Sequence, residues 1–292
     1  SILYILPNIA GHVGADIIGV LLAADLYNKI GTYLAVDIGT NGEIMLSGKG
    51  RILACSTAAG PAFEGATIAQ GMRATAGAID KVILSDDGVQ IHTIGNSTPR
   101  GICGSGLIQC IGELLKMGMI SNNGKLSSRE EALGKGILPS LANHLTLRDG
   151  ARAFVLYDGK GKEDGVYLTQ KDIREVQLGK AAIAAGIRLL MKVLGVTVSE
   201  IDEVLLAGAF GNYIDKGSAL RIGLLPQIEE SRVRSIGNAA GTGASMALLS
   251  PDLLDLSKKL STYTEHIELA NHPDFQETYM QEMYFRFNGA KQ

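Results

Sequence analysis

The chain has 292 residues, of which 46% are hydrophobic and 20% charged, so it can bury a core as one large domain or two modest ones. Its 27 basic residues are scattered among 30 acidic ones and the net charge is -3, which argues against a nucleic acid partner. The longest apolar stretches, such as 17–24, are too short to span a bilayer, so we expect no membrane partner. Three cysteines without a C-x-x-C pair fall short of an iron–sulfur cluster, and they favour a cytoplasmic protein over a secreted disulfide framework.

In the first half of the chain, apolar spacing and glycine turns mark the expected elements. A helix is expected over 10–29, because small and apolar residues recur at helical spacing. Next come a helix over 105–119 and short strands, at least partly antiparallel, over 33–37, 43–46, 52–55, 78–84 and 89–94. Residues 121–164 are polar and weakly patterned, so we expect a surface excursion or small insertion there.

The second half alternates strands and helices. Thr169 and Asp172 resemble a capping box that opens a long helix ending near Leu194. Strands are expected over 203–207 and 232–236, each followed by a glycine turn and a helix, and an amphipathic helix over 274–285. Strands mixed with crossover helices favour the α/β class.

The first candidate site is the turn Asp37-Ile38-Gly39-Thr40-Asn41-Gly42-Glu43, which follows an apolar strand. Gly39 and Gly42 let backbone N–H groups approach phosphate oxygens, and Thr40 and Asn41 add side-chain donors. Asp37 would then face a bound Mg²⁺, which prefers oxygen ligands. An ordinary hairpin turn, which Asn-Gly favours, explains the same residues equally well.

The second candidate is Gly208-Ala209-Phe210-Gly211, which follows a buried strand. Such a turn lets a flat adenine or ribose lie against the backbone, because no large side chain blocks the approach. Close packing of strand against helix is the alternative, and the turn by itself favours that alternative. The sequence contains neither the G-x-G-x-x-G dinucleotide fingerprint nor a P-loop.

In their order along the chain, these motifs resemble the superfamily of acetate and sugar kinases, heat-shock chaperone ATPase domains and actin. The resemblance makes 37–43 the second phosphate loop and 206–211 the adenosine loop. Runs of small residues at 10–16 and 238–244 resemble the two connecting helices, whose close crossing forms a hinge in two-lobed ATPases. The first phosphate loop has no candidate and is expected upstream of Ser1. The implied fold is an α/β, ribonuclease-H-like lobe with a mixed sheet and flanking helices.

Longer runs resemble the C-terminal ASKHA region of reductive activators of corrinoid enzymes, namely 37–43, 56–65, 99–106, 169–175 and 272–276. The resemblance covers nearly the whole chain. It implies an activator that uses ATP in returning a Co(II) corrinoid to Co(I), with a [2Fe-2S] cluster in an N-terminal region outside this chain. The implied partner is a corrinoid protein of a methyltransferase or demethylase system, and a homodimer is one possible assembly.

Three residues outside the two turns are further candidates. Glu64 could orient an attacking water or hold a metal-bound water, although a helix-start carboxylate stabilised by the helix dipole is an equal alternative. The hydroxyl of Ser105 and the backbone N–H of Gly104 could contact phosphate or ribose. Cys103 lies at a helix start, where a thiolate is favoured, but a small packed residue explains it better.

We therefore expect residues 1–292 to form an ASKHA ATPase region that binds ATP and Mg²⁺, with Asp37 and Glu64 as catalytic residues. The expected parts are a connecting helix over 1–31, a nucleotide-binding lobe over 32–120 and 165–292, and an insertion over 121–164. Two alternatives use the same scaffold. A kinase for a sugar or carboxylate would release a phosphorylated product, whereas a chaperone-like ATPase switch would only change partner binding.

Overall fold

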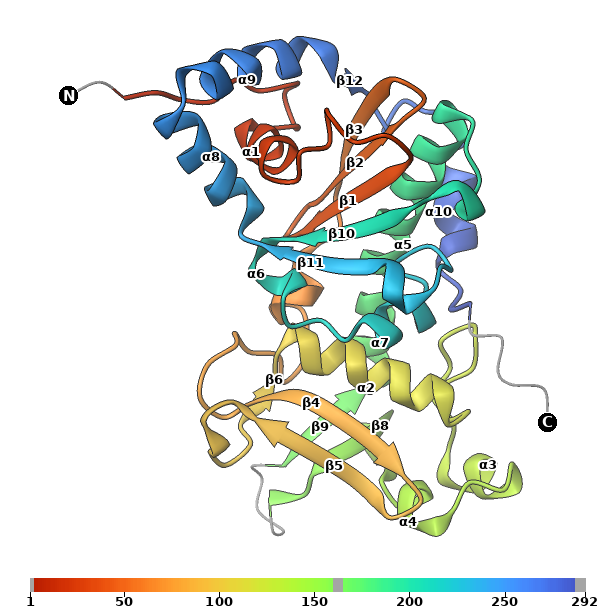
Figure 1. Ribbon diagram of the computed structural model, residues 1–292. Helices are drawn as coiled ribbons and strands as arrows, with labels where there is room; N and C mark the ends of the chain where they lie inside the picture. Colours follow the sequence, from red (N-terminus) through yellow and green to blue (C-terminus); the bar gives the residue numbers. More distant parts are fainter. Residues whose placement is uncertain (1–2, 160–164, 287–292) are drawn as a thin grey trace. The chain divides into compact units, whose positions relative to one another are not determined.

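The computed structural model describes residues 3–159 and 165–286, and the chain forms two compact units (Figure 1). The first unit comprises Ser1–Ala58, Ala182–Tyr213 and Pro226–Tyr279, and the second comprises Ala59–Ala181, Ile214–Leu225 and Met280–Gln292. This division differs from the boundaries drawn on the sequence, because 59–120 falls with 121–164 in the second unit. The assignment of a nucleotide-binding lobe and an insertion stays a prediction.

The first unit is built on a six-stranded sheet with the order β11-β10-β1-β2-β3-β12. Strands β1, β2 and β3 form an antiparallel meander, β10 and β11 extend it in parallel on the β1 side, and β12 pairs in parallel with β3. The expected mixed sheet is confirmed. The strands are β1 (Tyr33–Ile38), β2 (Gly42–Gly48), β3 (Arg51–Thr57), β10 (Glu203–Ala207), β11 (Val233–Gly237) and β12 (Glu265–His266).

Helices cover both faces of this sheet. On one face, Ala35, Met45 and Leu205 share a buried cluster with residues of three helices, α1 (Ala15–Ala23), α8 (Ala239–Leu249) and α9 (Pro251–Tyr263) (Figure 1). On the other face lies the second half of α5 (Gln170–Leu194), where a Cβ added to Gly186 would be 2.6 Å from Ile44 Cδ1. Alternate residues of each strand therefore face different helices.

The two helices with small residues cross closely, as the sequence predicts. A Cβ added to Gly19 of α1 would be 2.5 Å from the Ala240 carbonyl oxygen of α8, and one added to Gly243 would collide with the Gly19 carbonyl. The expected helix over 10–29 is nevertheless too long. Gly14 precedes α1 with an extended backbone, and after Ala23 the chain turns at Asp25, whose φ of 53° is left-handed and cannot continue a helix.

The second unit contains two three-stranded sheets, with the orders β5-β4-β6 and β7-β8-β9. Residues 121–164 were expected to form a surface excursion or small insertion, and no element was assigned to them. Within 121–159 the chain carries two short helices and two of these strands; residues 160–164 lie outside the described part. The strands are β4 (Ala78–Ser85), β5 (Gly88–Thr93), β6 (Gly101–Ile102), β7 (Leu145–Arg148), β8 (Ala151–Tyr157) and β9 (Val166–Thr169). The helices are η1 (Pro61–Glu64), η2 (Ile94–Asn96), α2 (Gly104–Lys116), α3 (Arg129–Gly134), α4 (Pro139–Ala142) and α7 (Lys216–Arg221).

The capping box of α5 is confirmed. The backbone N–H of Thr169 donates to Asp172 Oδ2 at 2.8 Å, and the N–H of Asp172 donates to Thr169 Oγ1 at 3.1 Å. The remaining short elements are η4 (Val198–Glu200), α6 (Gly208–Gly211), η5 (Glu230–Arg232) and α10 (Phe275–Glu282). Among the described residues, no helix has both the length and the apolarity needed to cross a bilayer.

Candidate functional site

The two candidate turns of the first unit lie side by side. Strands β1 and β10 are parallel neighbours in which Asp37 is paired with Ala207, so both strands end at the same edge of the sheet. The first turn is tight, because the Gly39 N–H donates to the Asn41 carbonyl at 2.9 Å. The convergence of these two turns, which the sequence interpretation requires, is confirmed.

Gly208 is the point at which the second turn meets the first. Its φ of +82° lies in the left-handed region, and a Cβ added there would collide with Asp37 Oδ1. Only glycine therefore permits the Asp37 carboxylate to lie against this backbone.

Further along this turn, packing explains the residues well. A Cβ on Gly211 would be 3.1 Å from Leu206, and the Gly211 carbonyl accepts a hydrogen bond from Ser235 Oγ of β11 at 2.7 Å. Phe210 is partly buried in the same short helix, α6. For Gly211, the packing alternative is thus supported directly.

Two carboxylates lie beside Asp37. Glu43 is its cross-strand partner on β2, and Asp16 stands in the first turn of α1, the helix that packs on this face of the sheet. Ser56, the cross-strand partner of Glu43 on β3, donates its hydroxyl to Glu43 Oε1 at 3.4 Å. The Asp16 carboxylate accepts the Ile17 N–H at 2.8 Å, a favourable place for an acidic residue at a helix start.

This arrangement raises the affinity of the carboxylates for protons. Burial raises the pKa of Asp37 above its ordinary value, and the Asp16 carboxylate raises it further. Burial, followed by the Asp16 and Asp37 charges, raises the pKa of Glu43 to about 7, although the Ser56 hydroxyl opposes the shift. A cation bound here would reduce the repulsion between the carboxylates, as protonation does.

The donor set suits Mg²⁺ only together with other ligands. Among residues 3–159 and 165–286, no group of three or more His, Cys, Asp and Glu side chains could hold a metal ion by itself. Mg²⁺ in nucleotide sites is usually bound by one or two carboxylates together with phosphate oxygens and water. Asp37, with Asp16 and Glu43 nearby, fits that pattern.

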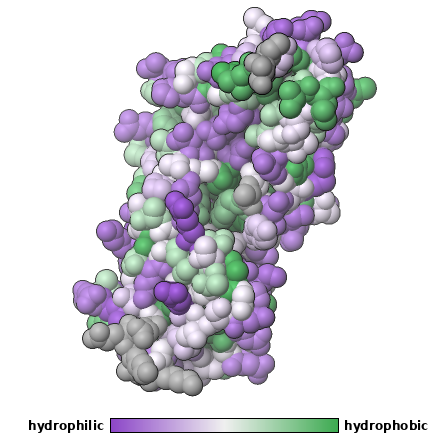
Figure 2. All heavy atoms as spheres, turned by 90° about the vertical axis from the view of Figure 1, so that its left-hand side faces the viewer, coloured by the Kyte–Doolittle hydropathy of each residue, from purple (hydrophilic) through white to green (hydrophobic). Residues whose placement is uncertain are grey.

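A pocket of about 550 Å³ opens beside Asp16. Its walls come from the N-terminal residues Leu3, Tyr4 and Leu6 and from α8, where Ala240 and Leu248 contribute. Leu3 and Leu248 are 84% and 71% exposed, and Figure 2 shows apolar side chains gathered near the N-terminal end. Asp16 is therefore the member of the acidic cluster that lines this pocket.

Comparison with known proteins decides the family. The sequence model described as the C-terminal domain of RACo, the ASKHA domain, matches residues 31–292. The chain belongs to this family. The expected actin-like α/β fold class is thereby confirmed, and an ASKHA domain implies nucleotide binding.

Two relatives of this chain have names that refer to corrinoids. The chain is 41% identical over 285 residues to "Corrinoid activation enzyme RamQ" of Eubacterium limosum, covering 97% of this chain and 47% of that protein. It is 26% identical over 309 residues to a Methanosarcina barkeri protein named "[Co(II) methylated amine-specific corrinoid protein] reductase", covering 97% of this chain and 51% of that protein. The chain thus spans about half the length of these relatives.

A solved structure shares the fold. "Reductive activator for corrinoid,iron-sulfur protein" superposes with a TM-score of 0.85 at 34% identity, covering 97% of this chain and 44% of that one. The resemblance to the ASKHA region of corrinoid activators, first drawn from short sequence runs, is therefore confirmed.

The other candidate residues of this ASKHA chain belong to the second unit. Glu64 is exposed at the end of η1, and Gly104 and Ser105 begin α2. Ser105 is 6% exposed, and its Oγ lies 3.4 Å from Cys103 Sγ, which is itself buried. Packing thus explains Cys103, while phosphate or ribose contacts from Gly104 and Ser105 and a catalytic role for Glu64 stay predictions.

Two residues of the acidic cluster were missed as site residues. Asp16 and Glu43 both lie inside runs that the sequence analysis singled out, but no role was given to either. Their proximity to Asp37 depends on the β1–β2 register and on the packing of α1, which are properties of the fold.

Proposed function

We propose that this chain is the ATP-binding and ATP-hydrolysing part of an activator that drives the reduction of Co(II) corrinoid to Co(I) on a corrinoid protein. The observation that carries the proposal is the meeting of Asp37 with the Gly208 turn in a chain of the RACo C-terminal family. The names of two relatives and of one solved structure support corrinoid activation. No feature of the described residues favours the kinase or the chaperone-like switch over this function.

Phosphoryl transfer needs positioning and charge neutralisation more than covalent chemistry. In our proposal the backbone N–H groups of Gly39 to Gly42, with Thr40 and Asn41, bind phosphate oxygens. The Gly208 turn, with Ala209, Phe210 and Gly211, holds the adenosine. Asp37 would hold Mg²⁺ or its water ligands, and a bound Mg²⁺ would supply positive charge against the phosphate oxygens. Glu64 is the proposed residue that orients the attacking water.

The iron–sulfur cluster of such an activator is proposed to lie outside residues 1–292. Cys55, Cys103 and Cys110 are all buried and free, and burial raises the pKa of the Cys55 and Cys110 thiols far above the ordinary value. A cluster needs several thiolates close together, and thiols held protonated in a core are poor ligands. The electron would therefore enter through another part of the activator or another protein.

An ATPase assay distinguishes the functions. We expect hydrolysis of Mg–ATP to be stimulated by a Co(II) corrinoid protein, with ADP and phosphate as the only products. A phosphorylated sugar or carboxylate would instead indicate a kinase, and hydrolysis indifferent to the cobalt oxidation state would indicate a switch. Asp37→Asn should lose most of the activity, whereas the matched control Asp255→Asn should keep it, because Asp255 is exposed on α9 and pairs only locally with Lys258.

A further inference from the structure

Three parallel strands of the first unit end in one row at the sheet edge that carries Asp37. Asp37 of β1 is paired with Ala207 of β10, and Ala207 is paired with Gly237 of β11. Neighbouring strands lie about 4.8 Å apart, so the ends of β1 and β11 are about 10 Å apart along this edge. The Gly208 turn follows the middle strand, and α8 begins directly after β11 (Figure 1). With phosphates at the first strand and ribose at the second, the end of β11 is the place left for a base.

Asn212 lies at this end of the row. It follows α6 directly, and α6 is tied to β11 because Ser235 Oγ donates to the Gly211 carbonyl at 2.7 Å. A Cβ added to Gly237 would be 3.4 Å from Asn212 Nδ2 and 3.7 Å from Asn212 Oδ1. Both ends of the Asn212 amide therefore lie beside the last residue of β11.

The Asn212 amide is available to a ligand. The residue is exposed, and within the described part of the chain no hydrogen bond engages its amide. Asn238, the neighbouring asparagine, already uses its side-chain oxygen to accept the Gly241 N–H at 3.0 Å, which caps α8. Asn212 is thus the asparagine of this corner that can offer an amide donor and an amide acceptor together.

We propose that Asn212 selects adenine by bonding to N6 and N7 of the base, an inference that rests on the proposed ATP site. The amide oxygen accepts from the N6 amino group and the amide nitrogen donates to N7, a pairing that fits asparagine to adenine. Hypoxanthine and guanine carry an oxygen acceptor in place of this amino group. Only one of the two bonds can then form, and the amide oxygen faces another acceptor.

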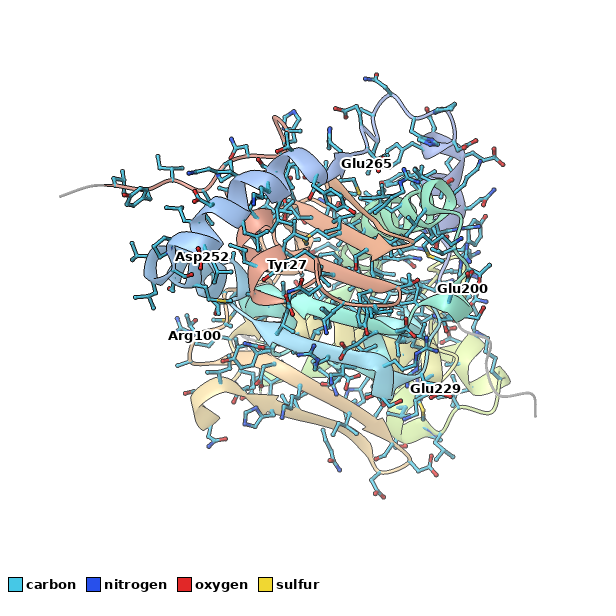
Figure 3. The ribbon with its side chains drawn as sticks, turned by 45° about the horizontal axis from the view of Figure 1, so that its top comes forward. Tyr27, Arg100, Glu200, Glu229, Asp252 and Glu265 are labelled. Atoms are coloured by element: carbon cyan, nitrogen blue, oxygen red, sulfur yellow. The ribbon has the colours of Figure 1, made fainter. Side chains whose placement is uncertain are left out.

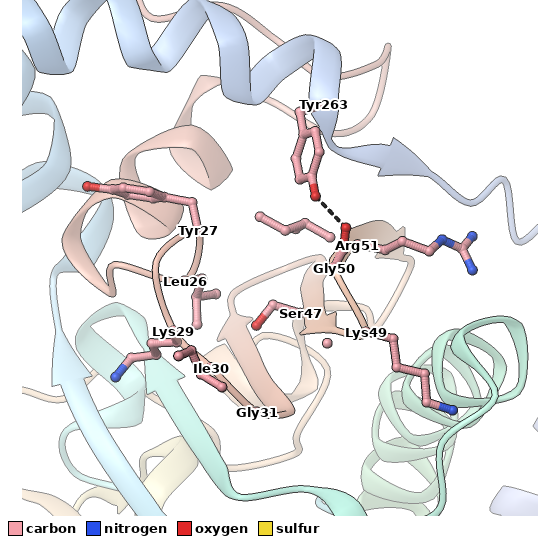
Figure 4. Close-up of a pocket in the computed structure, with 12 residues that line it drawn as sticks. Leu26, Tyr27, Lys29, Ile30, Gly31, Ser47, Lys49, Gly50, Arg51 and Tyr263 are labelled. Atoms are coloured by element: carbon pink, nitrogen blue, oxygen red, sulfur yellow. Dashed lines mark hydrogen bonds between the residues drawn. The ribbon is translucent and has the colours of Figure 1, made fainter.

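A second pocket of the first unit does not compete for the nucleotide. It has a volume of about 370 Å³ and lies at the opposite end of β1 and β2 from the acidic cluster (Figure 4). Arg51 beside it makes two hydrogen bonds to Glu265 of β12, at 2.8 and 2.7 Å (Figure 3 labels Glu265). Lys49 Nζ donates to the carbonyl that follows α5, and Lys29 Nζ lies 4.7 Å from the centre of the Tyr33 ring. These cations already have partners, so the pocket is a poor site for a triphosphate.

The test is a calorimetric titration of the 292-residue chain with Mg–ATP and with Mg–ITP, whose base is hypoxanthine and whose ribose and phosphates are the same. The parent chain should bind ATP at least about fivefold more tightly than ITP, the lower limit for one bidentate pair. Asn212→Ala should remove this preference, chiefly by weakening the binding of ATP. Retained binding of ITP would verify that the variant is folded.

Asn28→Ala is the matched control. Asn28 belongs to the same unit but stands between Tyr27 and Lys29, which line the second pocket, and its Nδ2 donates to Asp25 Oδ1 at 2.8 Å. This variant should keep the preference of the parent chain for ATP.

Two results would overturn the inference and leave ATP binding in place. These are equal affinity of the parent chain for ATP and ITP, and a preference for ATP that survives in Asn212→Ala. An equal loss of affinity for both nucleotides in Asn212→Ala would also overturn it, because that loss indicates a structural role. A parent chain that binds neither nucleotide would contradict the proposed ATP site itself, and this inference with it.

Discussion

Replacing Glu43 by glutamine should change how the stability of the first unit depends on pH. The pKa of Glu43 is raised from 4.5 to about 7 in the fold, first by burial and then by the Asp16 and Asp37 carboxylates. Between these values the folded chain binds more protons than the unfolded chain, so the free energy of unfolding falls as pH rises. The stabilising contribution of protonated Glu43 is complete below pH 4.5 and is lost as pH rises through 7.

The size of the effect follows from this pKa. A fully enclosed group would contribute about 1.4 kcal/mol for each pH unit between the two values. Glu43 is only partly buried, so water screens it and we expect about 1 to 2 kcal/mol in total. Glutamine stays neutral at both pH values. The difference in unfolding free energy between Glu43→Gln and the parent chain should therefore be about 1 to 2 kcal/mol more favourable to the variant at pH 8 than at pH 5.

Urea unfolding followed by circular dichroism at pH 5 and pH 8 measures this difference. Glu131→Gln is a control without this pH dependence, because Arg152 and Lys125 lower the pKa of Glu131 to about 2 and its titration therefore lies below pH 5. The stability of Glu131→Gln relative to the parent chain should be the same at pH 5 and at pH 8. An equal stability difference between Glu43→Gln and the parent chain at both pH values would refute the proposed carboxylate repulsion.

Three other substitutions test the fold and the site. Gly208→Ala places a methyl group on Asp37 and in a left-handed backbone, so Mg–ATP affinity measured by calorimetry should fall at least about tenfold, and an unchanged affinity would contradict the site. Gly243→Ala should lower the unfolding free energy by about 1 to 3 kcal/mol through its clash with Gly19, whereas the open position Gly11 should accept alanine. Asp172→Ala removes the α5 cap and the acceptor of the Ala69 N–H, so urea unfolding should show a loss of about 1 to 3 kcal/mol; no loss would mean that the capping box is dispensable.

Features encoded in short segments could be predicted from the sequence. The meander of β1, β2 and β3 follows from apolar runs separated by Gly39–Gly42 and by 48–50. The capping box of Thr169 and Asp172 predicts the start of α5. The meeting of the two turns was also predictable, because a strand that ends in Asp37 and one that ends in Ala207 need only be parallel neighbours.

Features that depend on contacts between distant segments were missed. Strand β9 pairs with β8 across 160–164, so no local turn signal identifies β9. Strand β8 does follow a local hairpin signal that was overlooked, the Asp149-Gly150 turn after β7. The carboxylate of Glu43 meets Asp37 across the sheet and Asp16 through α1, which no spacing along the chain reveals. Helix α9 is different, because Ser250 followed by Pro251 is a local start signal that was overlooked.

The most direct test of the proposed function is the absorbance spectrum of the corrinoid cobalt. A Co(II) corrinoid protein would be mixed with this chain and a low-potential chemical reductant, with and without Mg–ATP, using the parent chain and Asp37→Asn. Our account predicts that ATP increases the Co(I) fraction with the parent chain and not with Asp37→Asn. A Co(I) fraction that is the same with and without ATP for the parent chain would contradict it.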